Sequence, residues 1–206
     1  MFPFIFSIVI ALSGTVPHDG IEESVELVFE ATIGSKMIGE LKAVRQLQND
    51  SVVYIVTSEI NAQIGFQLVQ DYRLKAVYRD GLLERSELFN VVNDKVRANT
   101  KIHWDGERYI ATRMKKTLIS TLPVNYSVAH LFFQEPEGIE EIFSENYAEY
   151  LECKSENSEL SKKYYIRIPD GSKVYYYYNK GICEQFEVRM LVFNVRYSLK
   201  KVNPLP

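Results

Sequence analysis

Short turn signals divide almost the whole chain into segments of about one strand each. The pairs are Gly34-Ser35, Asn49-Asp50, Asp80-Gly81, Asn93-Asp94, Asp105-Gly106, Asp170-Gly171 and Lys180-Gly181. Gly, Asn and Asp tolerate the positive φ that a tight hairpin turn needs. The intervals between most of these pairs are too short to hold a strand, a crossover helix and a second strand. Successive strands are therefore expected to be antiparallel neighbours joined by hairpins.

The segments between the turns have the residue types and the period of β-strands. The clearest is 66–79, in which apolar and polar side chains alternate, so that one face is buried and the other meets water. The chain has 14 Tyr and 11 Phe against one Trp, a mixture that favours strands over helices. Strands are predicted near residues 24–33, 37–48, 51–62, 66–79, 82–92, 95–104, 107–114, 116–121, 163–168, 173–179, 182–189 and 191–200.

Long antiparallel strands that follow one another in the chain must twist and curl. We therefore expect a mainly β fold, a single domain of long antiparallel hairpin-connected strands that form a curved sheet or a partly open barrel. The length of 206 residues suits one such domain, because two domains of half that size would each have a marginal core.

The interval from Leu122 to Ser161 lacks hairpin signals. Apolar side chains at i, i+3 and i+4 from Val128 predict a helix of about two or three turns, and a second short turn is indicated from Ile139 onward. One or two short helices are thus expected between about residues 125 and 147, packed over one mouth or face of the sheet. Residues 154–163 are polar and are predicted to form an exposed loop.

Residues 1–14 have the features of a signal peptide. An apolar run from Phe2 to Leu12 is followed by the small residues Ser13 and Gly14. As a helix this run would be about 16 Å long, too short for a bilayer core of about 30 Å. Because no Lys or Arg precedes the run, a buried N-terminal strand or helix is the alternative. We expect an exported protein, periplasmic or extracellular, without a transmembrane anchor once the signal is removed.

The rest of the chain divides into a flexible N-terminal segment (15–23), a single β-rich domain (24–200) and a C-terminal tail (201–206). The net charge of −3 and the pI of about 5.7 give no positive excess that would bind nucleic acid. In an oxidising compartment Cys153 and Cys183 either form a disulfide or remain free, buried thiols.

The sequence holds no recognisable catalytic or metal-binding motif. None of the histidines, His18, His103 and His130, has another His, Cys or Glu at metal-ligand spacing. Nucleophile elbows and phosphate-binding loops are also missing. The acids from Glu135 to Glu145 contain the two carboxylates that a glycosidase needs, but such a run is more typical of a solvated face. We therefore expect no catalytic residue, no metal and no cofactor, and favour a non-enzymatic role.

Four consecutive tyrosines, Tyr175–Tyr178, follow Tyr164 and Tyr165 across one predicted turn. Two of the four point to each face of a strand, and aromatic pairs across strands stabilise a hairpin. That packing role is the favoured interpretation. The alternative is an amphipathic platform for a sugar or lipid, with Tyr164, Tyr175 and Tyr177 as its ligand-binding candidates.

Five segments carry a family resemblance. They are Gly34–Leu41, Tyr72–Gly81, Asn125–Val128, Leu131–Pro136 and Ile166–Gly171. Through them the chain resembles an uncharacterised family of secreted β-rich proteins common in the Bacteroidota, over about residues 24–200. The resemblance implies an exported domain of unknown function and supplies no catalytic residue. More loosely, the expected architecture is similar to envelope lipoprotein-carrier folds.

Three functions follow as hypotheses. The leading one is a non-enzymatic envelope protein that binds an apolar, lipid-like ligand in or on the curved sheet, since a sheet of long strands can enclose more volume than its side chains fill. The alternative is a protein-interaction or assembly factor that uses an exposed strand edge or the aromatic hairpin. The third is an enzyme with a dispersed carboxylate site. The expected partner is an apolar small molecule or an envelope protein.

Overall fold

The structure, a computed structural model, describes residues 23–63, 65–156, 162–190 and 192–205. They form strands and one short 3₁₀ helix, η1 (Val128–Phe132). The strands are β1 Val25–Ile33, β2 Lys36–Gln48, β3 Ser51–Gln63, β4 Gln67–Arg79, β5 Leu82–Val92, β6 Lys95–Trp104, β7 Tyr109–Arg113, β8 Lys116–Ser120, β9 Glu141–Ser144, β10 Glu149–Ser155, β11 Lys162–Arg167, β12 Lys173–Asn179, β13 Ile182–Arg189 and β14 Asn194–Pro204. The predicted signal peptide and residues 15–22 lie outside the described residues.

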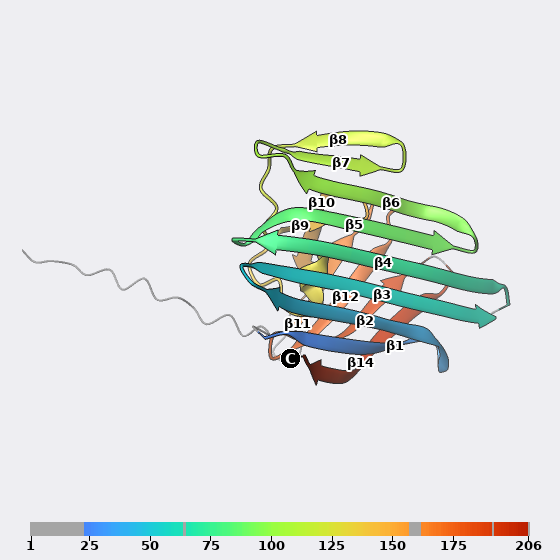
Figure 1. The fold of residues 1–206 in the computed structure, drawn as a ribbon. Coiled ribbons are helices and arrows are strands. Elements are labelled where there is room, and N and C mark those ends of the chain that lie inside the picture. The colour runs from blue at the N-terminus through green and yellow to red at the C-terminus, as the bar shows by residue number, and fades with distance from the viewer. Residues whose placement is uncertain (1–22, 64, 157–161, 191, 206) are drawn as a thin grey trace, which may run out of the picture.

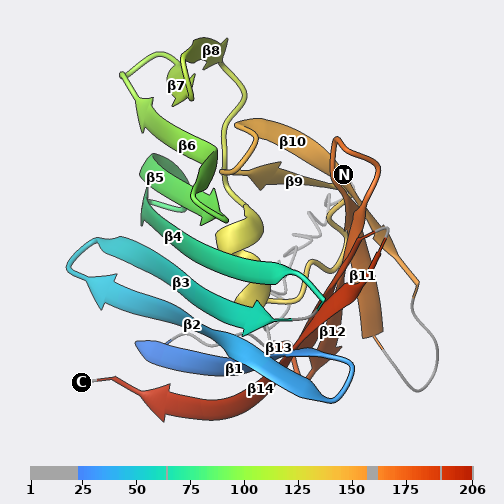
Figure 2. The same cartoon turned by 90° about the vertical axis from the view of Figure 1, so that its right-hand side faces the viewer.

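All these strands belong to one 14-stranded sheet in the order β8-β7-β6-β5-β4-β3-β2-β1-β14-β13-β12-β11-β10-β9. Every pair of neighbours is antiparallel, and β14 returns to pair with β1. The sheet curls until its C-terminal strands face the long strands β2 to β6, with η1 enclosed between them (Figures 1 and 2). The prediction of a mainly β, curved antiparallel sheet is confirmed.

The two edge strands, β8 and β9, are not paired with each other, so the barrel is not closed by backbone hydrogen bonds. Side chains join the two halves instead. Arg113 Nε on β7 donates to the carbonyl oxygen of Asn146 at 2.8 Å, and the Arg113 guanidinium lies over the Tyr147 ring at 5.3 Å. The β9–β10 turn therefore contacts the inner face of β7 at the place where a closed barrel would have a strand pair.

The turns have the backbone conformation that their residues predict. In the β4–β5 turn Asp80 and Gly81 have φ of 50° and 75°, and in the β12–β13 turn Lys180 and Gly181 have φ of 50° and 78°. Two successive residues with positive φ match the right-handed twist of the flanking strands. Each hairpin register is thereby set locally.

The helix η1 fills one end of the curled sheet. Phe132 packs edge-on against Phe29 of β1, with ring centroids 5.9 Å apart, and against Phe186 of β13 at 5.5 Å. Tyr178 of β12 donates its hydroxyl hydrogen to the Leu131 carbonyl at 2.7 Å. We call this end, where the β2–β3, β4–β5 and β12–β13 turns lie, the plugged end. The opposite end, with the β1–β2, β3–β4 and β13–β14 connections, is the open end.

Three expectations for the C-terminal half need correction. The predicted helix of two or three turns is a single 3₁₀ helix of 5 residues. The second helical turn expected from Ile139 is instead β9, and β10 begins at Glu149 without having been predicted. The turn between them lacks Gly, with Ala148 taking a φ of 56°, so it gives no hairpin signal in the sequence. Finally, β14 continues to Pro204, so most of the predicted tail pairs with β1.

The close approach of β2 and β3 leads to a first prediction, on Gly39. A Cβ built at Gly39 would lie 2.1 Å from the Glu59 carbonyl oxygen, a backbone atom that cannot move aside. We expect Gly39→Ala to destabilise the protein by about 1–3 kcal/mol, as overpacking does. Urea denaturation measures this, with Glu40→Ala on the same strand as the control, expected to lie within about 0.5 kcal/mol of the native chain. Equal effects of the two substitutions would contradict the close approach.

Candidate functional site

The plugged end is organised around Ser127 and His130, which close the N-terminus of η1. The Ser127 backbone N–H donates to His130 Nδ1 at 3.2 Å, and Ser127 is the N-cap residue. His130 thus takes the position that Glu or Gln has in a capping box. Because Nδ1 accepts a hydrogen bond, the ring proton lies on Nε2. Burial, aided by the positive charge of Arg45, lowers the pKa of His130 to about 3, so the ring is neutral.

Three tyrosine rings surround His130. Tyr54 of β3, Tyr78 of β4 and Tyr126 have ring centroids 4.6, 4.5 and 4.9 Å from the imidazole. Together with His130 they line a cavity of about 620 Å³ at the plugged end. His130 Nε2 has no hydrogen bond to any described residue. A neutral imidazole with a fixed Nε2–H therefore borders this cavity.

A second cavity of about 840 Å³ adjoins the first, and both are lined by Ile139 and Glu141. Glu137, Glu140 and Glu152 also line it. The walls are mainly acidic and solvent-facing, as the sequence predicts for most of this acidic run. This second cavity has few apolar side chains and does not suit a lipid-like ligand.

Glu145 differs from the other acids of the run, because it lies inside the sheet. Ser127 Oγ donates to Glu145 Oε1 at 2.5 Å, and the Tyr78 hydroxyl donates to Ser127 Oγ at 2.7 Å. Burial raises the pKa of Glu145 to about 7, although the hydrogen bond from Ser127 acts in the opposite direction. Oε2 makes no hydrogen bond to a described residue. The expectation of a solvated face is wrong at this position.

This network is closed to substrates. Ser127 is fully buried and Glu145 is 1% exposed, so no substrate bond reaches the hydroxyl or the carboxyl. A pair of catalytic carboxylates is not formed, because no second buried carboxylate with a lowered pKa accompanies Glu145 among the described residues. The described residues also contain no group of three His, Cys, Asp or Glu side chains that could hold a metal ion. The arrangement supports a structural role, in which the Tyr78–Ser127–Glu145 chain holds η1 in the sheet.

The inner face of the open end, where Ile38 and Ile60 are buried, also carries a group of half-buried apolar side chains. They pack against the core from several strands and loops, and they are Ile33, Val92, Ile168, Val174, Val188 and Phe193. Phe66 of the β3–β4 hairpin meets Phe193 of the β13–β14 loop, with ring centroids 5.5 Å apart. Since β4 and β13 are not neighbours in the sheet, this contact joins two separate parts of the open end.

The largely apolar interior between the two ends contains a few polar side chains. Ser58 Oγ on β3, Ser86 Oγ on β5, Glu145 Oε2 and Asn146 Oδ1 are buried atoms without a hydrogen bond among the described residues. Tyr72, which pairs with Ser58 across β3 and β4, is only half-buried. Buried polar atoms cost free energy unless they find a partner. The middle of the interior therefore offers unpaired acceptors and hydroxyls below the apolar open end.

The tyrosines of the aromatic hairpin do not form an open platform. Tyr164 is inside, with its hydroxyl donating to Glu135 at 2.7 Å and its ring against Tyr178 at 5.6 Å. Tyr175 is on the outer face but is only 6% exposed, because Arg189 and Lys163 lie over its ring at 4.0 and 4.5 Å. Tyr177 is half-buried beside the same lysine. The structure places all three in packing contacts.

Cys153 on β10 and Cys183 on β13 are buried and free. Their strands are separated by β11 and β12, so three steps of about 4.8 Å lie between them along the sheet. A disulfide needs Cα atoms within about 7 Å. Burial raises the pKa of Cys153 to about 11 and also raises that of Cys183, so neither thiol is reactive at neutral pH. Free, buried thiols are the alternative that the structure shows.

Comparisons with known proteins concern the fold. A family model described as a domain of unknown function, DUF6134, matches residues 29–200. The crystal structure of a beta-barrel-like protein of domain of unknown function DUF1849 from Brucella abortus is similar, with a TM-score of 0.55 and 11% identity over 89% of this chain and 98% of that chain. No curated protein matches the sequence. The described part of the chain has no helix long and apolar enough to cross a bilayer.

Proposed function

The chain belongs to the DUF6134 family of uncharacterised domains, and from that premise we propose that it is a non-enzymatic protein that binds an apolar, lipid-like ligand through its open end. One observation carries the proposal: half-buried apolar side chains from several strands and loops, among them Val92, Val174 and Val188, gather on the inner face of the open end, opposite the end that η1 fills. Exposed apolar surface is unfavourable by about 25 cal/mol per Å², so a contiguous apolar face that meets water is typical of a binding site.

The few polar side chains in the middle of the interior suit one end of an amphiphile. Tyr72, Asn90 and Asn146 are all half-buried, so groups at this depth are still in contact with solvent. Asn146 Oδ1 is an acceptor there without a hydrogen bond to a described residue. A ligand with an apolar body and a hydrogen-bond-donating end would cover the aliphatic side chains and donate to this acceptor. The predicted signal peptide belongs to the same proposal, which places the protein and its ligand outside the cytoplasm.

A second candidate function rests on the free edge of β8. This strand pairs with β7 on one side only, and its Leu118 and Ile119 side chains are exposed. An unpaired edge with exposed apolar side chains can accept a strand from a partner protein. The enzyme hypothesis has no comparable support, because the Ser127–Glu145 pair is closed to substrate.

Ligand binding is tested by native mass spectrometry of the protein purified from its own envelope, before and after organic extraction. We expect an additional bound mass that the extraction removes. Val188→Glu places a charge on the apolar inner face, and we expect it to lower the bound fraction at least about tenfold. Thr57→Glu on the exposed outer face of β3 is the matched control and should keep the ligand. An apo mass for the native protein, together with no binding of a fluorescent long-chain fatty acid, would disprove the proposal.

A further inference from the structure

The connections at the open end carry exposed apolar side chains. Val192 is 85% exposed and Met37 57%, and Phe66 and Met190 are also exposed. Hairpin tips of soluble proteins normally carry polar residues, so apolar side chains in three connections at one end are unusual.

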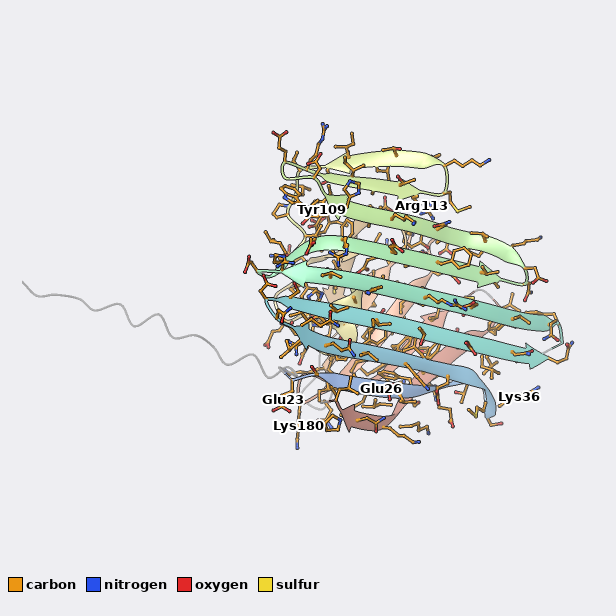
Figure 3. The ribbon with its side chains drawn as sticks, viewed as in Figure 1. Glu23, Glu26, Lys36, Tyr109, Arg113 and Lys180 are labelled. Carbon is orange, nitrogen blue, oxygen red and sulfur yellow. The ribbon has the colours of Figure 1, made fainter. Side chains whose placement is uncertain are left out.

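Contacts between the connections show that they lie side by side. Phe66 and Phe193 join the β3–β4 and β13–β14 connections through their rings. Lys36 at the start of β2 donates from Nζ to the Gln63 carbonyl oxygen at 2.7 Å, which joins the β1–β2 and β3–β4 connections. Figure 3 shows Lys36 at the far end of the β1–β2 hairpin, away from the labelled Tyr109 and Lys180 at the plugged end. We call Met37, Phe66, Met190, Val192 and Phe193 the apolar rim.

Positive charge surrounds the apolar rim. The open-end connections and the strand ends beside them contain Lys36, Lys95, Lys115, Lys116 and Lys173, and none of these lysines has an ion-pair partner among the described residues. The acids of these connections and strand ends are Asp94, Glu149 and Asp170. The whole chain has a net charge of −3, so the positive open end is a local reversal.

The plugged end differs, because its charges are of both signs and partly paired. Its β2–β3, β4–β5 and β6–β7 turns contain Asp50, Asp80, Asp105 and Glu107, of which Asp50 pairs with Arg79 and Asp105 with Arg108, and Lys180 lies in the β12–β13 turn. Figure 1 shows these turns at the end of the long strands opposite the β1–β2 and β3–β4 hairpins. The far end therefore carries charges of both signs, several of them paired, whereas the lysines of the open end have no ion-pair partner among the described residues.

We infer that the open end docks on a membrane surface that contains anionic phospholipids, with the apolar rim entering the interface and the lysines contacting the headgroups. Lysines beside exposed aromatic, Met and Val side chains match the two components of such a surface, negative headgroups and the acyl boundary. An acidic protein would form ion pairs with the lysines but would leave the side chains of the apolar rim exposed to water. The docking does not depend on the proposed ligand, although it would bring the open end to a source of one.

Vesicle co-sedimentation tests the docking. The native protein is expected to sediment with vesicles of equimolar phosphatidylglycerol and phosphatidylcholine, to remain free with phosphatidylcholine alone, and to dissociate as salt is raised. The rim variant Phe66→Ser/Val192→Ser and the charge variant Lys36→Glu/Lys173→Glu should each lose at least about tenfold in binding. The matched controls at the plugged end, Leu82→Ser and Lys180→Glu, should bind like the native protein.

The position of the single tryptophan gives a test of orientation. Trp104 lies at the plugged end, against Tyr109 at 4.9 Å, and should stay in water when the open end docks. Its emission should not change with vesicles, whereas the Phe66→Trp indole in a Trp104→Phe background should shift to the blue. Equal binding to both vesicle types, loss of binding by the plugged-end controls, or a blue shift of Trp104 would each overturn the inference. Val188→Glu, which tests the ligand, should still dock, so the two proposals fail separately.

Discussion

Glu145→Gln should make the protein more stable than the native chain by about 3 kcal/mol at pH 8 and leave it of similar stability at pH 4. Burial raises the pKa of Glu145 from 4.5 to about 7 in the fold. The folded state therefore holds a proton that the unfolded chain releases above pH 4.5. Its contribution is fully present below pH 4.5 and is lost as pH rises through about 7. Gln keeps an oxygen for the Ser127 hydrogen bond but does not ionise.

His130 acts in the opposite direction over an overlapping range. Its pKa falls from 6.5 in the unfolded chain to about 3 in the fold, so its contribution is present above pH 6.5 and is lost as pH falls toward 3. In the native protein the two slopes cancel between about pH 4.5 and 6.5. Stability of Glu145→Gln should rise with pH through that range, because only the histidine slope remains.

Urea denaturation at a series of pH values between 4 and 8 measures both effects as the difference between variant and native chain. The exposed acid Glu141 supplies the control, since Glu141→Gln should follow the native curve throughout. Parallel curves for the native protein and Glu145→Gln would mean that the Glu145 carboxyl titrates as it does in water, and the buried position would be wrong.

The repeating hairpins are the part of the fold that local chemistry determines. The strand predicted at 66–79 is observed as Gln67–Arg79, and that predicted at 82–92 is observed as Leu82–Val92. Between them Asp80 and Gly81 adopt the positive φ that the residue types allow. Where a turn is made by residues with that preference and the strands alternate, each register follows from a few neighbouring residues.

The segment between β8 and β11 cannot be predicted in the same way, because distant contacts determine it. β9 is only 4 residues long and is held by β10 on one side and by a bridge from Phe143 to Ser127 on the other. The η1 helix is fixed by aromatic side chains of β1 and β13, which lie far away in the sequence. A 3₁₀ helix has three residues per turn, and η1 is only 5 residues long. So short a segment has too few turns for a periodic sequence pattern to be recognised.

Glu145 shows the same limit for the candidate site. It is the last acid of the run that begins at Glu135, and its residue type favours an exposed position. The only local signal is the spacing of Ser127 and His130, which is that of a capping box with His in the place of Glu or Gln. That spacing indicates the start of η1 but contains no information about the carboxyl that accepts the Ser127 hydrogen bond. The half-buried face of the open end likewise depends on how far η1 enters the sheet.

Phe132→Ala should destabilise the protein by about 3–5 kcal/mol, the range for removing a large buried aromatic side chain. Phe132 is 4% exposed and touches Phe29, Phe186 and Phe133, with ring centroids 5.5 to 6.4 Å apart. No described residue at the plugged end is free to fill the space, because Ser127 and the Leu131 carbonyl fix η1 through hydrogen bonds from Tyr78 and Tyr178. The loss should appear as a lower urea midpoint with an unchanged m-value.

Phe89→Ala is the matched control for this substitution, since Phe89 lies on the exposed outer face of β5 and should cost less than about 0.5 kcal/mol. If η1 plugs the sheet as a rigid element, the void left by Phe132→Ala is apolar and enclosed, and benzene should bind there and recover part of the stability. If η1 instead collapses into the void, the cost falls toward the transfer free energy alone and benzene has no effect. A cost as small as that of Phe89→Ala would show that the plugged end is not packed and that η1 does not close this end of the sheet.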